Sequence, residues 1–261
     1  MAYTLSYDSY DLSATPFFMT LQSFSRPVLA SIRQDVRGLG IYNGSKALGG
    51  SRDGVSLVCE LHTFDTTPTL VEAKINALRY LLDPKSDKKI ATSMIPGQYW
   101  MGRPMGEVTL EAYDETGSII SLQFFCPLPY AYSTTLQTVV NAGGSFTILA
   151  AAVAASSEDI WPTFVVRNTG GTPLTNLVIE NQTTSEILTW HGSLPVGWRM
   201  KIETETLEVF RSADGVTWEY YMLGKTGFYT SIRPRVNNYL VVTPTGSTIE
   251  LTTTFRERFK A

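Results

Sequence analysis

The sequence predicts a mostly β protein with two domains, in which strands surround one helix in the first domain and a β-sandwich forms the second. Three observations lead to this class. Apolar and polar residues alternate from Val55 to Leu61, helical spacing is clear in one segment only, and short β-rich runs separated by turn residues fill the second half. The predicted domains span residues 1–133 and 134–261.

One strand and one helix are the best-defined elements of the predicted first domain. Val55, Leu57, Cys59 and Leu61 share one face of a strand, which is therefore half-buried. Apolar residues then recur at helical spacing after Thr67-Pro68, and Asp83-Pro84 ends the segment. The pattern predicts a helix over about residues 68–82, whose apolar positions are Val71, Ile75, Leu78 and Leu82.

The first domain ends with a predicted hairpin, followed by prolines that end regular strand pairing. The runs Glu107 to Tyr113 and Ser118 to Cys126 are separated by the polar loop Asp114-Glu115-Thr116-Gly117, which favours a hairpin. Pro127 and Pro129 then interrupt regular pairing, because proline removes a backbone donor and fixes its own φ. We therefore place the domain boundary just after this stretch.

The second domain shows the recurring short strands of a sandwich. The predicted strands are Thr163 to Arg167, Leu177 to Glu180, Ile187 to Trp190, Arg199 to Glu203, Leu207 to Arg211, Val216 to Met222, Tyr239 to Thr243 and Ile249 to Phe255. Asp214-Gly215 gives the strongest hairpin signal, since both residue types accept positive φ. The alanine-rich segment from Thr138 to Ala155 fits either a helix or strands.

Composition excludes several classes of function. Charged residues make up 17% of the chain against about 25% in ordinary soluble domains, so much of the surface is expected to be either uncharged polar or covered by partners. With a net charge of −3 and no basic cluster, nucleic-acid recognition is not expected. The longest apolar run, Phe146 to Ala155, is too short to cross a membrane, and the start lacks the features of a signal peptide. A chain made in the cytoplasm, with Cys59 and Cys126 as buried reduced thiols, is expected.

No constellation of residues predicts catalysis, a metal site or a cofactor. His62 and His191 lie far apart and outside any metal-binding spacing, and no serine or cysteine has a histidine nearby in sequence to act as its base. Glu203 and Glu205 could present two carboxylates on one strand face, as a glycoside hydrolase would need. A solvated strand edge explains that pair more simply, and we expect no enzyme.

A carbohydrate-binding module is the second function that the residues suggest. Four of the five tryptophans, Trp161, Trp190, Trp198 and Trp218, fall in the second domain, and flat aromatic faces stack on sugar rings. Sandwich cores also take tryptophan, so core packing is the alternative. If a host glycan is bound, Trp190 and Trp198 are its expected contacts.

Several segments together resemble the distal tail protein family, called Dit, of siphophages and related tailed phages. They are Gly50-Ser51-Arg52-Asp53-Gly54 before the Val55 strand, Leu78-Arg79-Tyr80-Leu81-Leu82 followed by Gln98-Tyr99-Trp100-Met101-Gly102-Arg103, the stretch from Ile119 to Tyr132, and the runs Thr163 to Gly171 and Leu177 to Asn181. Two positions depart from the family pattern. Ser51 interrupts the first motif, and Arg235-Val236-Asn237-Asn238 stands where the family has a Pro-Gly-x-Asn turn.

The resemblance implies a structural protein of the virion tail tip. It implies that the first domain forms a hexameric ring between the tail tube protein and the tail hub or fibre proteins, and that the second is a galectin-like or jelly-roll sandwich. Ring or domain-junction contacts are then expected at Arg52, Asp53, Tyr99, Trp100, Pro127, Pro129 and Tyr130. The resemblance implies no reaction and no cofactor.

Overall fold

The computed structural model describes residues 3–27, 32–38, 45–83, 86–112, 116–221, 225–227 and 229–260, with the backbone alone described at 32–38, 45–52, 112 and 225. The chain divides into two compact units. The first comprises Met1–Tyr132 with Lys260–Ala261, and the second comprises Ser133–Phe259. The mostly β class is confirmed, and within the described residues one segment is an α-helix.

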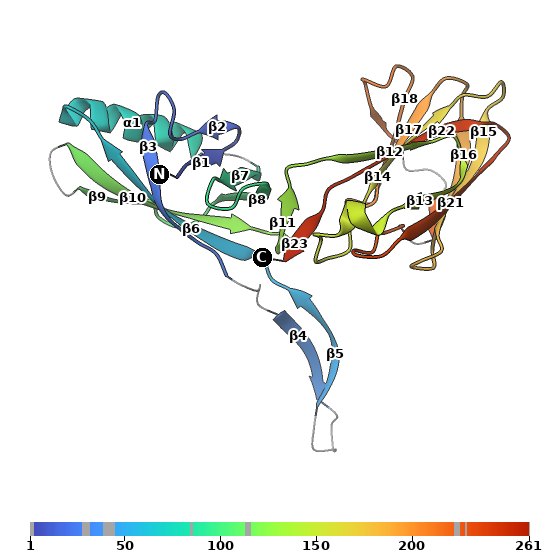
Figure 1. Cartoon of the computed structure of the whole chain (residues 1–261), viewed down its shortest axis with the longest axis horizontal. Helices are drawn as coiled ribbons and strands as arrows, with labels where there is room; N and C mark the ends of the chain where they lie inside the picture. The colour runs from blue at the N-terminus through green and yellow to red at the C-terminus, as the bar shows by residue number, and fades with distance from the viewer. Residues whose placement is uncertain are drawn as a thin grey trace. The chain divides into compact units, whose positions relative to one another are not determined.

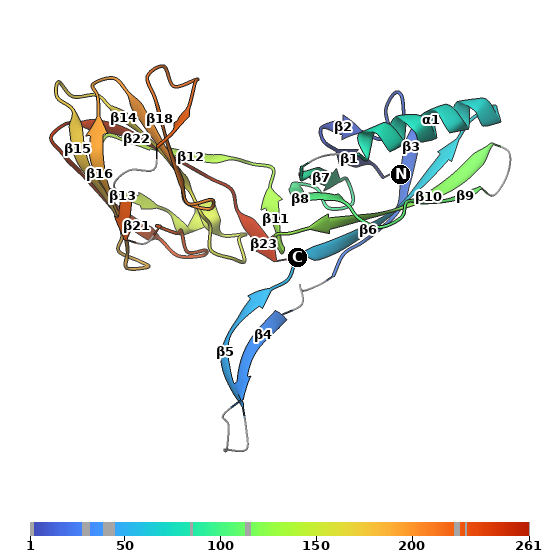
Figure 2. The same ribbon diagram turned by 180° about the vertical axis from the view of Figure 1, so that it is seen from behind.

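The first unit contains one sheet, one helix and a separate ribbon (Figure 1). Its elements are β1 (Leu5–Tyr7), β2 (Tyr10–Asp11), β3 (Met19–Ser25), β4 (Ile32–Gly38), β5 (Ser45–Arg52), β6 (Val55–Phe64), α1 (Pro68–Leu81), β7 (Lys88–Thr92), β8 (Gln98–Pro104), β9 (Thr109–Ala112), β10 (Gly117–Cys126) and β11 (Tyr130–Ser133). The sheet order is β2-β1-β7-β8-β10-β6-β3, and β9 pairs with β10. Strands β4 and β5 pair with each other as a two-stranded ribbon (Figure 2).

Strand β6 and helix α1 follow the sequence pattern closely. Val55, Leu57, Cys59 and Leu61 are all buried, as their alternation predicts. Helix α1 begins after Thr67, whose Oγ1 accepts a hydrogen bond from the Leu70 amide at 3.4 Å. It buries Val71, Ile75 and Leu78, but the fourth residue of that face is Lys74, which the apolar pattern does not reveal.

The end of β10 is held between two glycines. A Cβ at Gly54 would lie 2.6 Å from the Cys126 carbonyl oxygen, and one at Gly102 would lie 2.6 Å from the Phe125 carbonyl oxygen. Both neighbouring chain segments therefore approach the backbone of β10 more closely than a side chain allows. Regular pairing of β10 ends at Cys126, immediately before Pro127.

The second unit is a two-sheet sandwich, which confirms the predicted sandwich. Its elements are β12 (Gln137–Asn141), β13 (Gly144–Ile148), the 3-10 helix η1 (Ala150–Val153), β14 (Thr163–Asn168), β15 (Leu174–Asn181), β16 (Glu186–Leu194), β17 (Arg199–Glu203), β18 (Glu208–Ser212), β19 (Glu219–Tyr220), β20 (Lys225–Gly227), β21 (Asn238–Thr245), β22 (Ile249–Phe255) and β23 (Arg258–Lys260). One sheet has the order β12-β22-β14-β17-β18-β19, and the other has the order β13-β21-β15-β16-β20. Their inward residues, among them Phe164, Trp190 and Leu251, form one core.

Three local predictions in the second unit need correction or refinement. The strand expected from Val216 to Met222 begins at Glu219, and the β18–β19 connection is a longer loop in place of a two-residue turn at Asp214-Gly215. The Asp214 carboxylate explains this loop, because its Oδ1 accepts hydrogen bonds from the Val216 and Thr217 amides at 2.8 and 2.9 Å. The ambiguous alanine-rich segment forms β12, β13 and η1.

Two further predictions concern loops. Runs 109–112 and 117–126 pair as the predicted hairpin, although Asp114 and Glu115 of its loop lie outside the described residues. In the segment that lacks the family's glycine, Arg235 itself adopts a positive φ of 62°. The buried Asn238 side chain holds this turn, donating hydrogen bonds to the carbonyl oxygens of Arg233 at 2.8 Å and Val236 at 3.0 Å.

Candidate interaction surfaces

The residues considered for catalysis occupy structural positions. Glu203 forms an ion pair with Lys201 at 2.7 Å, while Glu205 forms an ion pair with Arg258. Strand β17 ends at Glu203, so the two carboxylates do not share a strand face. Among the described residues, no group of three or more His, Cys, Asp or Glu side chains is arranged to hold a metal ion. No observation favours the hydrolase alternative.

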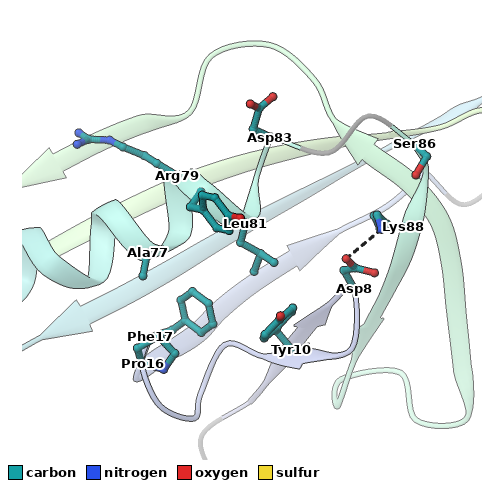
Figure 3. A pocket seen from close by; sticks show the side chains of 11 residues that line it. Asp8, Tyr10, Pro16, Phe17, Ala77, Arg79, Leu81, Asp83, Ser86 and Lys88 are labelled. Carbon is teal, nitrogen blue, oxygen red and sulfur yellow. Dashed lines mark ion pairs between the residues drawn. The ribbon is translucent and has the colours of Figure 1, made fainter.

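Two hollows flank helix α1 in the first unit. The larger, of about 770 Å³, lies beside the C-terminal half of α1 and is lined by Tyr10, Phe17 and Tyr80 together with the ion pair Asp8–Lys88, whose atoms are 3.0 Å apart (Figure 3). The smaller, of about 230 Å³, is more apolar, and its walls are Ile75, Leu78, Leu82, Val108, Leu110 and Ile120. Arg79 lines both hollows, so the exposed part of α1 forms a ridge between them.

Exposed aromatic and aliphatic side chains gather around this helix. We call Tyr10, Phe18, Phe64, Leu70 and Tyr80 the helix-side surface. Tyr80 is 91% exposed, and each of the other four is about half exposed. Phe18 and Phe64 both meet Lys74, which lies 5.4 Å from the Phe18 ring and donates to the Phe64 carbonyl oxygen at 2.7 Å. Several solvent-exposed aromatic side chains close together are typical of a surface that a partner covers.

The helix-side surface was not among the sites predicted from the sequence. A signal for it was present, since Tyr80 falls opposite Val71, Ile75 and Leu78 on the helix, where a polar residue would be expected. Tyr10 and Phe18 carry no such signal. Their exposure depends on how the chain folds around them.

The predicted ring or junction contacts divide into exposed and buried residues. Asp53 and Pro127 are exposed, Tyr130 is half-buried, and Tyr99 is half-buried against Tyr132 with 5.6 Å between ring centroids. Pro129 is buried. Only the backbone of Arg52 is described, and it is the last residue of β5.

Trp100 does not fit the predicted contact role. It is 0% exposed and packs against Phe24, with ring centroids 5.5 Å apart, while the guanidinium of Arg26 lies 5.7 Å from its ring. Because its faces are already occupied within the first unit, Trp100 is a core residue. Full burial within the first unit does not fit the ring or domain-junction contact expected of Trp100.

The tryptophans predicted to contact a glycan also change role. Trp190 is 1% exposed and packs in the sandwich core against Tyr221 at 6.2 Å, so no face of it is left for a sugar. Trp198 is half-buried, with the guanidinium of Arg211 at 5.6 Å from its ring. Core packing, the alternative considered for these residues, therefore describes Trp190.

Cys59 and Cys126 are free buried thiols, as expected. Burial raises the pKa of each to about 12, and Asp87 adds to the effect at Cys126. A thiol with so high a pKa stays protonated at neutral pH and is a poor nucleophile. Neither cysteine belongs to a reactive site.

The fold of this chain has counterparts among solved phage proteins. The crystal structure of the SPP1 Dit protein, described as a paradigm of the hub adsorption apparatus in phages that infect Gram-positive bacteria, aligns over 99% of this chain and 100% of its own, with a TM-score of 0.72 and 21% identity. The chain has the Dit fold.

A second solved phage structure contains a chain of similar fold. A chain of the phage P2 baseplate, in its activated conformation with calcium, aligns over 97% of this chain and 98% of its own, with a TM-score of 0.55 and 10% identity. Neither a protein-family model nor a curated protein sequence matches the chain. Among the described residues, none of the helices is long and apolar enough to cross a membrane.

Proposed function

We propose that this chain is a structural hub protein of a phage tail tip, in which the first unit forms a ring between the tail tube protein and the tail hub or fibre proteins. The observation that carries the proposal is the likeness to the SPP1 Dit protein over the full length of both chains. Because the similarity covers both units and not the sandwich alone, it supports the proposal more strongly than a common sandwich fold would.

The helix-side surface supports assembly through the first unit. A closed ring of identical subunits needs two different surfaces on each subunit that complement each other. The ridge of α1 lies between the larger hollow, which contains the Asp8–Lys88 ion pair, and the smaller, more apolar one, and it provides one surface of distinctive shape. We propose that a second copy of this chain covers it, and that the ring contains six copies.

The mass of the purified full chain tests this proposal. Native mass spectrometry and light scattering are expected to show a closed oligomer of six subunits. Tyr80→Ser combined with Phe18→Ser is expected to shift the population towards monomer, because removing exposed aromatic rings costs interface area without disturbing the core.

Tyr239→Ser is the matched control, since Tyr239 is 52% exposed but lies in the second unit. An unaltered oligomer in the double variant would place the interface elsewhere. A chain that stays monomeric at all concentrations, alone and with tail tube protein, would contradict the ring.

A further inference from the structure

The outward face of the six-stranded sheet places two arginines side by side. Inward residues of β14, β17 and β22, such as Val166, Met200 and Leu251, are buried, so the residues between them point away from the core. In this outward set, Arg167 of β14 lies directly opposite Arg199 of β17. On its other side, Arg167 lies opposite Glu250 of β22.

This pair of arginines is electrostatically unbalanced. Like charges directly opposite each other on neighbouring strands destabilise a sheet, and the single carboxylate of Glu250 offsets at most one of them. Within the described part of the chain, neither Arg167 nor Arg199 forms an ion pair with N–O contact within 4.0 Å. An anion bound between the guanidinium groups would relieve the repulsion.

The space for such an anion is present. Arg167, Arg199, Glu250, Val165 and Thr252 line a hollow of about 270 Å³ on this face. The guanidinium of Arg199 packs against the loop after β18, where a side chain at Gly215 would collide with it. Thr252 adds a hydroxyl group and Val165 an apolar side chain to the lining of this hollow.

The next row of the same face carries aromatic rings. Lys201 lies beside Val165 in the strand register and sits 4.5 Å from the Phe210 ring and 5.3 Å from the Trp218 ring. Tyr220, paired with Phe210 at the sheet edge, is 55% exposed. An exposed aromatic ring near hydroxyl groups and cations is suited to a sugar with an acidic substituent.

We propose that this face binds an anionic saccharide polymer, with a carboxylate or phosphodiester group held between Arg167 and Arg199 and a neighbouring sugar ring placed towards Tyr220. The site is different from the predicted Trp190 and Trp198 contacts. A nucleic acid fits poorly, because Glu203, Glu208 and Glu250 on the same face would repel a continuous row of phosphates. A saccharide needs only one charged group between the two arginines, because its hydroxyl groups make the remaining contacts.

Binding of defined polymers to the full chain tests the proposal. Calorimetry with a poly(glycerol phosphate) carrying sugar substituents and with an oligogalacturonate compares the two sources of negative charge, and neutral dextran serves as the uncharged probe. One or both anionic polymers are expected to bind, and dextran is not. Arg167→Gln and Arg199→Gln are each expected to weaken binding on the order of tenfold or more, the usual consequence of losing one charge-assisted contact.

Arg235→Gln is the charge-matched control, because Arg235 is exposed and lies in the turn before β21, outside this face. Thermal unfolding of each variant verifies that the sandwich is intact. Failure of both anionic polymers to bind the wild-type chain would overturn the proposal. So would binding that Arg235→Gln weakens as much as Arg167→Gln does, since attraction would then follow net charge alone.

Discussion

The ammonium group of Lys74 lies 3.0 Å from the carboxylate of Asp65, and the same nitrogen donates a hydrogen bond to the carbonyl oxygen of Phe64 at 2.7 Å. Lys74 belongs to the buried face of α1, whereas Phe64 is the last residue of β6. The hydrogen bonds from Lys74 and the Thr66 amide hold the pKa of Asp65 below its usual value. This lysine therefore ties the helix to the end of the strand that precedes it.

Lys74→Met is expected to destabilise the chain. Methionine keeps the apolar stem but removes the charged donor, and a hydrogen bond from a charged group contributes about 1.5–3 kcal/mol. The free energy of unfolding, measured with urea, should fall by that order. Arg79→Met is the control, because its ion pair with Glu72 is exposed and contributes less than about 1 kcal/mol. Equal losses in the two variants would show that the Lys74 contact is no stronger than a surface pair.

Gly54→Ala is expected to lower stability by about 1–3 kcal/mol, the usual cost of forcing extra volume into a packed site. The new methyl group would meet the Cys126 carbonyl oxygen and the Phe125 ring at 2.6 Å, so β6 or β10 must shift. Thermal unfolding measures the loss. Gly171→Ala is the control, since a Cβ there meets nothing within 4 Å. If Gly54→Ala leaves the thermal stability unchanged, the end of β10 can shift at little energetic cost.

The thiols of Cys59 and Cys126 are expected to resist labelling in the folded protein. With each pKa at about 12, the thiolate fraction at pH 8 is small, and both residues are buried. Reaction with a chromogenic disulfide reagent should be slow in buffer and should reach two thiols per chain in denaturant. Rapid labelling of the native protein would show that the first unit opens readily.

Asp159→Asn is expected to stabilise the protein at neutral pH. Burial raises the pKa of Asp159 above its usual 3.8, with Glu186 and Glu158 adding to the effect and Arg233 and Arg258 opposing it. A raised carboxyl pKa means that folding favours the protonated form, so this carboxylate lowers stability once pH rises through the folded pKa. Urea titrations should show a higher free energy of unfolding for the variant than for the wild type at pH 7. This difference should disappear below about pH 3.8, where Asp159 is protonated in both the folded and the unfolded state. A gain of the same size at every pH would contradict the electrostatic cause.

Asp214→Asn is expected to show the opposite pH dependence. Hydrogen bonds from the Val216 and Thr217 amides, and from the Ser212 hydroxyl, lower the pKa of Asp214 well below its usual 3.8. The carboxylate therefore stabilises the fold above that value, and the contribution is lost as pH falls through the lower folded pKa. The variant should be less stable at pH 7 and should converge with the wild type in acid, as monitored by near-ultraviolet circular dichroism. A pH-independent difference would indicate a steric effect of the amide in this loop.

Local patterns in the sequence predicted the elements whose cause is local. The alternation in β6, the helical spacing of α1 and the prolines after Cys126 each act on neighbouring residues, and all three appear in the structure at the expected positions. The β4–β5 ribbon was missed because its glycine-rich segment Ser45–Arg52 shows no alternation. The turn at Asp214 differs from the predicted two-residue turn because the Asp214 carboxylate accepts hydrogen bonds from two amides of the loop. The turn preferences of aspartate and glycine do not predict these hydrogen bonds.

The sequence did not predict which individual aromatic residues are buried. Trp100 and Trp190 look like surface candidates by residue type, yet both are among the largest side chains that are fully buried. Tyr80 on a clear helix is instead almost fully exposed. The mostly β class, strand β6 and helix α1 therefore follow from the chain's local chemistry alone. Tertiary structure decided which faces are covered, and it placed Arg167, Arg199 and Glu250 together, because strand register joins residues that are far apart in sequence.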